Sequence, residues 1–135
     1  MKSLCFTILL FLGFSLVACN KDKDSTIPST NGSPASFIGK WTGKYGFSND
    51  VPDHFFSLNI KTDGEIQELN SSGVAKGKGT WVMQGNTLKG NYKMLFIPFN
   101  EYSVIVTINS SGQMEGTWGY DKDGTDGGKL LLAKQ

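Results

Sequence analysis

Residues 101–120 read EYSVIVTINSSGQMEGTWGY, and this stretch decides the fold. Apolar and polar side chains alternate over 101–109 and again over 113–121, the period of two that predicts β-strands with one buried face. Asn109-Ser110-Ser111-Gly112 between them is rich in turn-forming residues. The stretch therefore predicts an antiparallel hairpin.

The same alternation of apolar and polar residues, interrupted by turn-forming residues, continues along the chain from Phe37 onward. No segment shows a sustained helical period. Sequential hairpins with this spacing predict an all-β antiparallel meander of eight strands. Closing the meander into an up-and-down barrel buries the apolar face and removes exposed edges, so we expect a barrel, with a β-sandwich as the alternative. The expected strands are 37–48, 54–62, 65–70, 76–84, 87–94, 101–109, 113–121 and 127–134.

Two segments depart from simple alternation. Leu130-Leu131-Leu132 is continuously apolar, which predicts a last strand that is covered on both faces. Met94 to Asn100 is an apolar connection, in which Pro98 disfavours a central strand. This connection is expected either to fold over one mouth of the barrel or to form an exposed apolar rim that admits a ligand or a partner.

The N-terminus predicts export and lipidation. Lys2 precedes the apolar run from Leu4 to Val17, and Ala18 lies directly before Cys19, in the order of a secretory signal peptide. Leu16-Val17-Ala18-Cys19 resembles the lipobox of bacterial lipoproteins, which implies a lipid on the Cys19 thiol. We therefore expect a signal peptide over 1–18, a lipidated cysteine and polar tether over 19–36, and one domain over 37–135. We expect the protein to lie in the bacterial cell envelope, anchored at the outer membrane. Whether it lies on the periplasmic or the surface face of that membrane is left open.

Composition narrows the possible functions. The chain has 13 basic residues, all of them lysine, against 12 acidic residues, so it lacks the basic, arginine-rich surface that nucleic acid requires. Cys5 and Cys19 both lie in the leader or at the lipid site. The mature domain is therefore expected to be stable without a disulfide.

A Gly-x-Trp tripeptide occurs three times, at 39–41, 79–81 and 116–118. Each glycine lies on the same face as its tryptophan, and a glycine inside a strand indicates bending or close approach. The first tripeptide resembles the start of lipocalins, and the whole chain resembles the small lipocalin-like lipoproteins of Bacteroidota. That resemblance implies an eight-stranded barrel around a small apolar ligand, although the arginine that lipocalins place across the tryptophan is missing.

Residues for catalysis are sparse. His54 stands alone beside Asp53, without a nucleophile or a second histidine. The carboxylates within 121–127 are expected to lie in a solvated turn, since the segment lacks the length and the closing glutamate of an EF-hand. Sequence spacing does not show whether any two of the glutamates form a catalytic pair; these are Glu65, Glu68, Glu101 and Glu115. We therefore expect a protein that is not an enzyme and that uses no metal or cofactor.

Aromatic residues are the candidates for ligand binding. Alternation projects six of them to one face, and two more lie in the apolar connection; they are Trp41, Tyr45, Trp81, Tyr92, Trp118, Tyr120, Phe96 and Phe99. The tryptophans either fill the core or contact a ligand. An open lumen would favour a carrier of a small apolar or aromatic compound. A filled lumen would favour an accessory lipoprotein whose loops meet an envelope protein.

Overall fold

A computed structural model describes residues 33–135. The expectations for the signal peptide, for Cys19 and for most of the tether lie outside the described residues. Within 33–135, no helix is long and apolar enough to span a bilayer.

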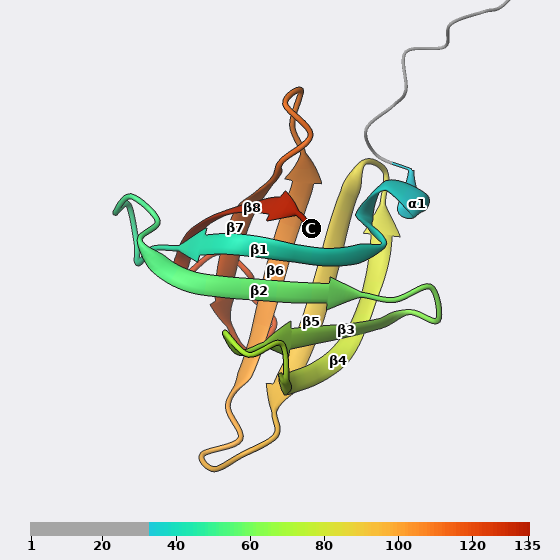
Figure 1. The fold of residues 1–135 in the computed structure, drawn as a ribbon. Helices are drawn as coiled ribbons and strands as arrows, with labels where there is room; N and C mark the ends of the chain where they lie inside the picture. The colour runs from blue at the N-terminus through green and yellow to red at the C-terminus, as the bar shows by residue number, and fades with distance from the viewer. Residues whose placement is uncertain (1–32) are drawn as a thin grey trace, which may run out of the picture.

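The chain forms a closed barrel in which each strand pairs antiparallel with the next and the last strand pairs with the first (Figure 1). This arrangement confirms the eight-stranded up-and-down barrel over the sandwich. One short helix precedes it, and the elements are α1 (Pro34–Phe37), β1 (Gly39–Tyr45), β2 (His54–Ile60), β3 (Glu65–Leu69), β4 (Ala75–Gln84), β5 (Thr87–Met94), β6 (Glu101–Ile108), β7 (Met114–Tyr120) and β8 (Gly128–Lys134).

The predicted strands all form, and their ends differ from the expected ones by at most three residues. The start of the chain differs in kind: Pro34–Phe37, expected as the end of the tether and the beginning of a strand, forms α1. Proline suits the first turn of a helix, where its missing N–H is not needed. Strand β8 also differs, because Leu131 is 40% exposed and only Leu130 and Leu132 point inward. The expectation that β8 is covered on both faces was therefore wrong.

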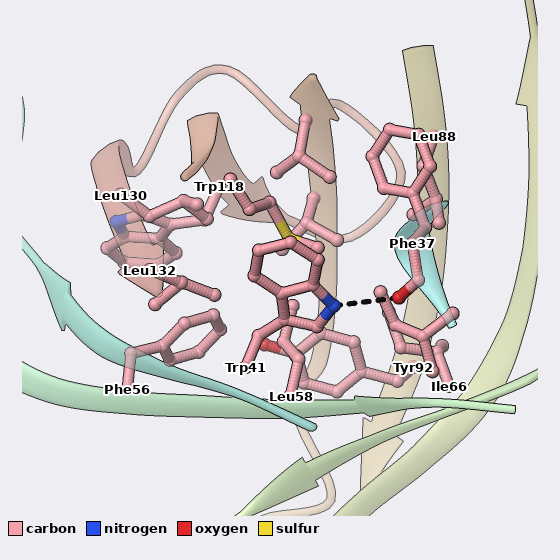
Figure 2. Packing of buried hydrophobic residues seen from close by; sticks show 14 residues of the cluster. Phe37, Trp41, Phe56, Leu58, Ile66, Leu88, Tyr92, Trp118, Leu130 and Leu132 are labelled. Carbon is pink, nitrogen blue, oxygen red and sulfur yellow. Dashed lines mark hydrogen bonds between the residues drawn. The ribbon is translucent and has the colours of Figure 1, made fainter. Parts of the chain in front are cut away.

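Inward-facing side chains form one packed core in the lumen (Figure 2). Trp41 is 1% exposed, and its Nε1 donates a hydrogen bond of 2.7 Å to the carbonyl oxygen of Phe37, which is itself fully buried. Helix α1 thus brings Phe37 across the barrel end, against residues such as Leu58 and Leu88. We call this the closed end; it carries α1 and the connections 61–64, 85–86 and 109–113.

Two of the Gly-x-Trp glycines let neighbouring strands approach closely. A Cβ atom at Gly79 would lie 1.8 Å from the backbone oxygen of Asn91, and one at Gly116 would lie 2.0 Å from that of Ile105. No side chain fits at either position, so the close approach inferred from the motif is confirmed there. Gly39 has a different role. It begins β1 with a φ of +122°, a backbone conformation that favours glycine.

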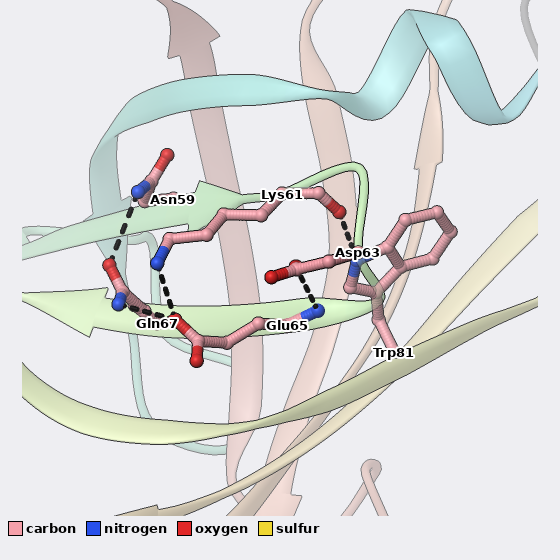
Figure 3. Close-up of polar contacts among 6 residues, drawn as sticks. All are labelled: Asn59, Lys61, Asp63, Glu65, Gln67 and Trp81. Atoms are coloured by element: carbon pink, nitrogen blue, oxygen red, sulfur yellow. Dashed lines mark hydrogen bonds and ion pairs between the residues drawn. The ribbon is translucent and has the colours of Figure 1, made fainter.

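A polar network on the outer surface holds the β2–β3 hairpin (Figure 3). Lys61 Nζ lies 2.6 Å from Glu65 Oε1, and Gln67 Nε2 donates to the same oxygen at 2.6 Å. The hydrogen bond from Lys61 lowers the pKa of the Glu65 carboxyl below its usual value. Trp81 Nε1 donates to the backbone oxygen of Lys61 at 2.9 Å, which fixes Trp81 at the closed end.

Candidate functional site

The opposite end of the barrel contains a cavity. This open end carries the connections 46–53, 70–74, 95–100 and 121–127. The cavity has a volume of about 260 Å³ and is lined by Tyr45, Phe47, Phe55, Phe56, Glu68, Lys76, Tyr92, Met94, Tyr102, Trp118 and Tyr120. The lumen is therefore filled at one end and hollow at the other.

Trp118 organises one wall of the cavity. Its Nε1 donates a hydrogen bond of 2.9 Å to the backbone oxygen of Gly46, so it holds the β1–β2 connection in place. The Tyr45 ring meets it edge to face with centroids 5.3 Å apart, and the Tyr120 ring does so at the same distance. Such edge-to-face contacts restrict ring movement, so this wall is preformed.

Tyr92 and Tyr102 lie together on the neighbouring strands β5 and β6, with ring centroids 6.0 Å apart. Gly77 leaves the space for Tyr92, because a Cβ there would lie 2.9 Å from its ring. Burial raises the pKa of Tyr92 well above its ordinary value, and the negative charge of Glu68 raises it further. The Tyr92 hydroxyl is therefore harder to ionise than that of an exposed tyrosine.

An ion pair also lies in the cavity wall. Glu68 Oε1 is 2.6 Å from Lys76 Nζ, and Glu68 is 5% exposed. Glu68 pairs with Gly77 and Leu69 pairs with Ala75, so Lys76 is the extra residue of a β-bulge. A bulge redirects a side chain that regular alternation would place elsewhere. This irregularity brings the Lys76 side chain to the same cavity as Glu68.

Exposed apolar side chains surround the open end. Strand β5 ends at Met94, and the connection after it extends beyond the barrel instead of folding over the mouth (Figure 1). Of the two alternatives for this segment, its exposure as an apolar rim is confirmed, and its contact with a ligand or a partner stays a prediction. Among residues 33–135, the exposed large apolar side chains at this end are Phe47, Val51, Phe55, Val74, Leu95, Phe96, Ile97, Phe99 and Tyr120.

The predicted ligand residues separate into three groups. Four of them line the cavity: Tyr45, Tyr92, Trp118 and Tyr120. Trp41 belongs to the core and Trp81 lies at the closed end, although both side chains are on the inward faces of their strands. Phe96 and Phe99 lie on the rim and do not line this cavity.

Sequence reasoning missed several lining residues. Phe56 and Tyr102 lie on the inward face of their strands, two residues before the core positions Leu58 and Val104, so alternation carried that signal. Glu68 is two residues from the fully buried Ile66 and shares its face, but it was considered only as one of several glutamates. Lys76 had no such signal, because alternation does not reveal a bulge.

Other polar groups at the open end do not form a second site. His54 Nε2 lies 3.3 Å from an oxygen of Asp53, and the His54 ring packs 5.3 Å from that of Tyr45. Within the described part of the chain, no cluster of three or more metal-ligating side chains occurs. The groups that line the open-end cavity are aromatic rings, tyrosine hydroxyls and the Glu68–Lys76 ion pair.

Comparison of the chain with protein-family models, with curated proteins and with solved structures finds no match.

Proposed function

We propose that this protein is a lipid-anchored barrel that binds a small ligand with an apolar or aromatic body and performs no catalysis. The open-end cavity is the observation that carries the proposal. At about 260 Å³ it is slightly smaller than the range of roughly 300–1,000 Å³ found for most ligand pockets, so it suits a compact molecule. Aromatic walls contact a planar or apolar body, and tyrosine hydroxyls orient a polar end.

The position of the helix supports anchoring through the N-terminus. Helix α1 lies at the closed end, so the chain leaves the domain opposite the cavity (Figure 1). A barrel tethered through a lipid on Cys19 would keep its mouth accessible. In this proposal the protein resides in the bacterial cell envelope, at the outer membrane.

Replacing Cys19 with alanine should abolish the incorporation of labelled fatty acid and leave an unlipidated precursor, because the expected lipobox then lacks the thiol that accepts the diacylglycerol. The measurement is metabolic labelling of the full chain, with Cys5→Ala as the matched control that keeps its label. Label that persists in the Cys19 variant would contradict the lipobox interpretation.

A neutral fluorescent probe, N-phenyl-1-naphthylamine, should bind the protein saturably. Trp118→Leu should weaken that binding about tenfold, since it removes apolar contact worth roughly 1.5 kcal/mol. Trp81→Leu is the matched control: each tryptophan donates one hydrogen bond of 2.9 Å to a backbone oxygen, but only Trp118 lines the cavity.

A titration of probe emission checks this, with cooperative melting of both variants as the test of folding. If Trp118→Leu and Trp81→Leu weaken probe binding equally, the probe binds outside the open-end cavity. Absence of a saturable response in the unmodified protein would favour the second candidate, an accessory lipoprotein. For that candidate the supporting observation is the exposed apolar rim at 95–99, to which an envelope protein would bind.

A further inference from the structure

We infer that the ligand of the open-end cavity is a small organic cation, with an ammonium group on an apolar or aromatic body. This inference rests on the proposed function and specifies its ligand class. It comes from the juxtaposition of a buried carboxylate, a wall of aromatic rings and two acidic loops, 46–53 and 121–127, at one end of the barrel.

The first step is the environment of Glu68. A carboxylate taken out of water requires a cation or several hydrogen-bond donors close to it. Lys76 supplies that cation at 2.6 Å, from a bulge, and its side chain is 32% exposed whereas that of Glu68 is 7% exposed. The ammonium of Lys76 can therefore withdraw into water while the carboxylate stays in the lumen. Lys76 occupies the site as an internal cation, and a ligand ammonium that replaces it preserves the charge balance.

The second step is the chemistry of the walls. The face of an aromatic ring carries negative electrostatic potential and attracts an organic cation, most strongly when water is excluded. Tyr45, Trp118 and Tyr120 pack edge to face at one side of the cavity. Tyr92 and Tyr102 add two rings from the adjacent strands. Rings on several sides of a cavity, together with one carboxylate, match what an alkylammonium group needs.

The third step is the charge of the two barrel ends. The four connections at the open end contain five aspartates and one lysine, a net charge of −4. The connections at the closed end contain only Lys61 and Asp63 as charged residues, so they are neutral. A field of this sign concentrates cations at the mouth and repels anions. An anion bound to Lys76 would in addition lie against Glu68, which opposes the use of that lysine as an anion anchor.

The test is displacement of N-phenyl-1-naphthylamine by three compounds that share one ring: benzyltrimethylammonium, benzyl alcohol and benzoate. The cation should compete at least about tenfold better than the neutral alcohol, and benzoate should be the weakest competitor. Raising the salt concentration should reduce the advantage of the cation, since exposed charges are screened.

Two substitutions in the ion pair give opposite results. Glu68→Gln should remove the preference for the cation and leave binding of the neutral probe. Lys76→Gln should increase the affinity for the cation several-fold, because it removes the internal competitor. If Lys76 were an anion anchor, the signs would be reversed: Lys76→Gln would lose benzoate binding, and Glu68→Gln would improve it.

A variant away from the core keeps the test valid if the ion-pair substitutions impair folding. Asp50 and Asp121 are exposed in two different open-end connections. The double variant Asp50→Asn, Asp121→Asn should weaken binding of benzyltrimethylammonium at low salt and leave benzyl alcohol unchanged. Saturable probe binding without a preference for the cation would overturn this inference alone. Failure of the probe and of all three compounds to bind would overturn the proposed function as well.

Discussion

Replacing Gly79 with alanine should destabilise the barrel by about 3 kcal/mol or more, at the upper end of the cost of overpacking. The added Cβ would lie 1.8 Å from the backbone oxygen of Asn91 and 2.5 Å from the Cα of Tyr92. Both atoms belong to the backbone of β5, so no side-chain rotation relieves the overlap. Strands β4 and β5 would have to separate, which weakens hydrogen bonds that close the barrel.

Urea denaturation followed by tryptophan emission measures this effect. Gly85→Ala is the matched control, because a Cβ at that β4–β5 turn meets no atom within 4 Å. Its positive φ of 60° costs only about 1–2 kcal/mol. Gly90→Ala should fall between the two, since its Cβ would contact the movable side chains of Ile66 and Val104. Equal destabilisation by the Gly79 and Gly85 substitutions would contradict close strand approach as the reason for the motif.

Replacing Trp41 with alanine should cost roughly 3–5 kcal/mol in the free energy of unfolding, because it leaves a large cavity in the closed end of the lumen. A second effect adds to the first. The carbonyl oxygen of Phe37 is the buried acceptor of Trp41 Nε1, and a buried polar group without its partner costs about 1–3 kcal/mol more. Helix α1 should then detach from the barrel end.

Two variants separate these effects. Trp41→Phe keeps most of the volume but removes the Nε1 donor, so it should cost about 1–3 kcal/mol. Trp81→Ala should cost less than Trp41→Ala, because Trp81 is only partly buried. Thermal and urea melts measure all three variants. A Trp41→Ala protein as stable as the unmodified one would show that the closed end can collapse without its tryptophan.

The sequence by itself determined the strands and their hairpin order, and it favoured a barrel over a sandwich. Alternation with a period of two places successive side chains on opposite faces, and turn residues at regular spacing allow only hairpins between them. A meander with one apolar face hides that face and its edges by closing into a barrel, and pairing between the last strand and the first shows that it does so here. These are local rules, so they could be applied to 54–62 or 101–109 without knowledge of the rest of the chain.

The sequence also determined which aromatic residues point inward, but not where along the barrel they lie. Trp41, Trp81 and Trp118 occur in the same tripeptide, yet the first two lie toward the closed end and only Trp118 lines the cavity. Alternation specifies a face and carries no information on depth, which depends on the register between strands. Register is a property of pairs of strands, such as Val104 opposite Trp118.

Only the tertiary structure decided which end is plugged and which charges enter the lumen. Helix α1 forms where a strand was expected to begin because Phe37 packs into the barrel, and long-range packing overrides local tendency there. The Glu68–Lys76 pair depends on one extra residue in β4, which breaks the alternation from which the rest was predicted. Packing and strand register depend on contacts between segments that are far apart in the chain. The patterns in a single sequence are local and do not contain those contacts.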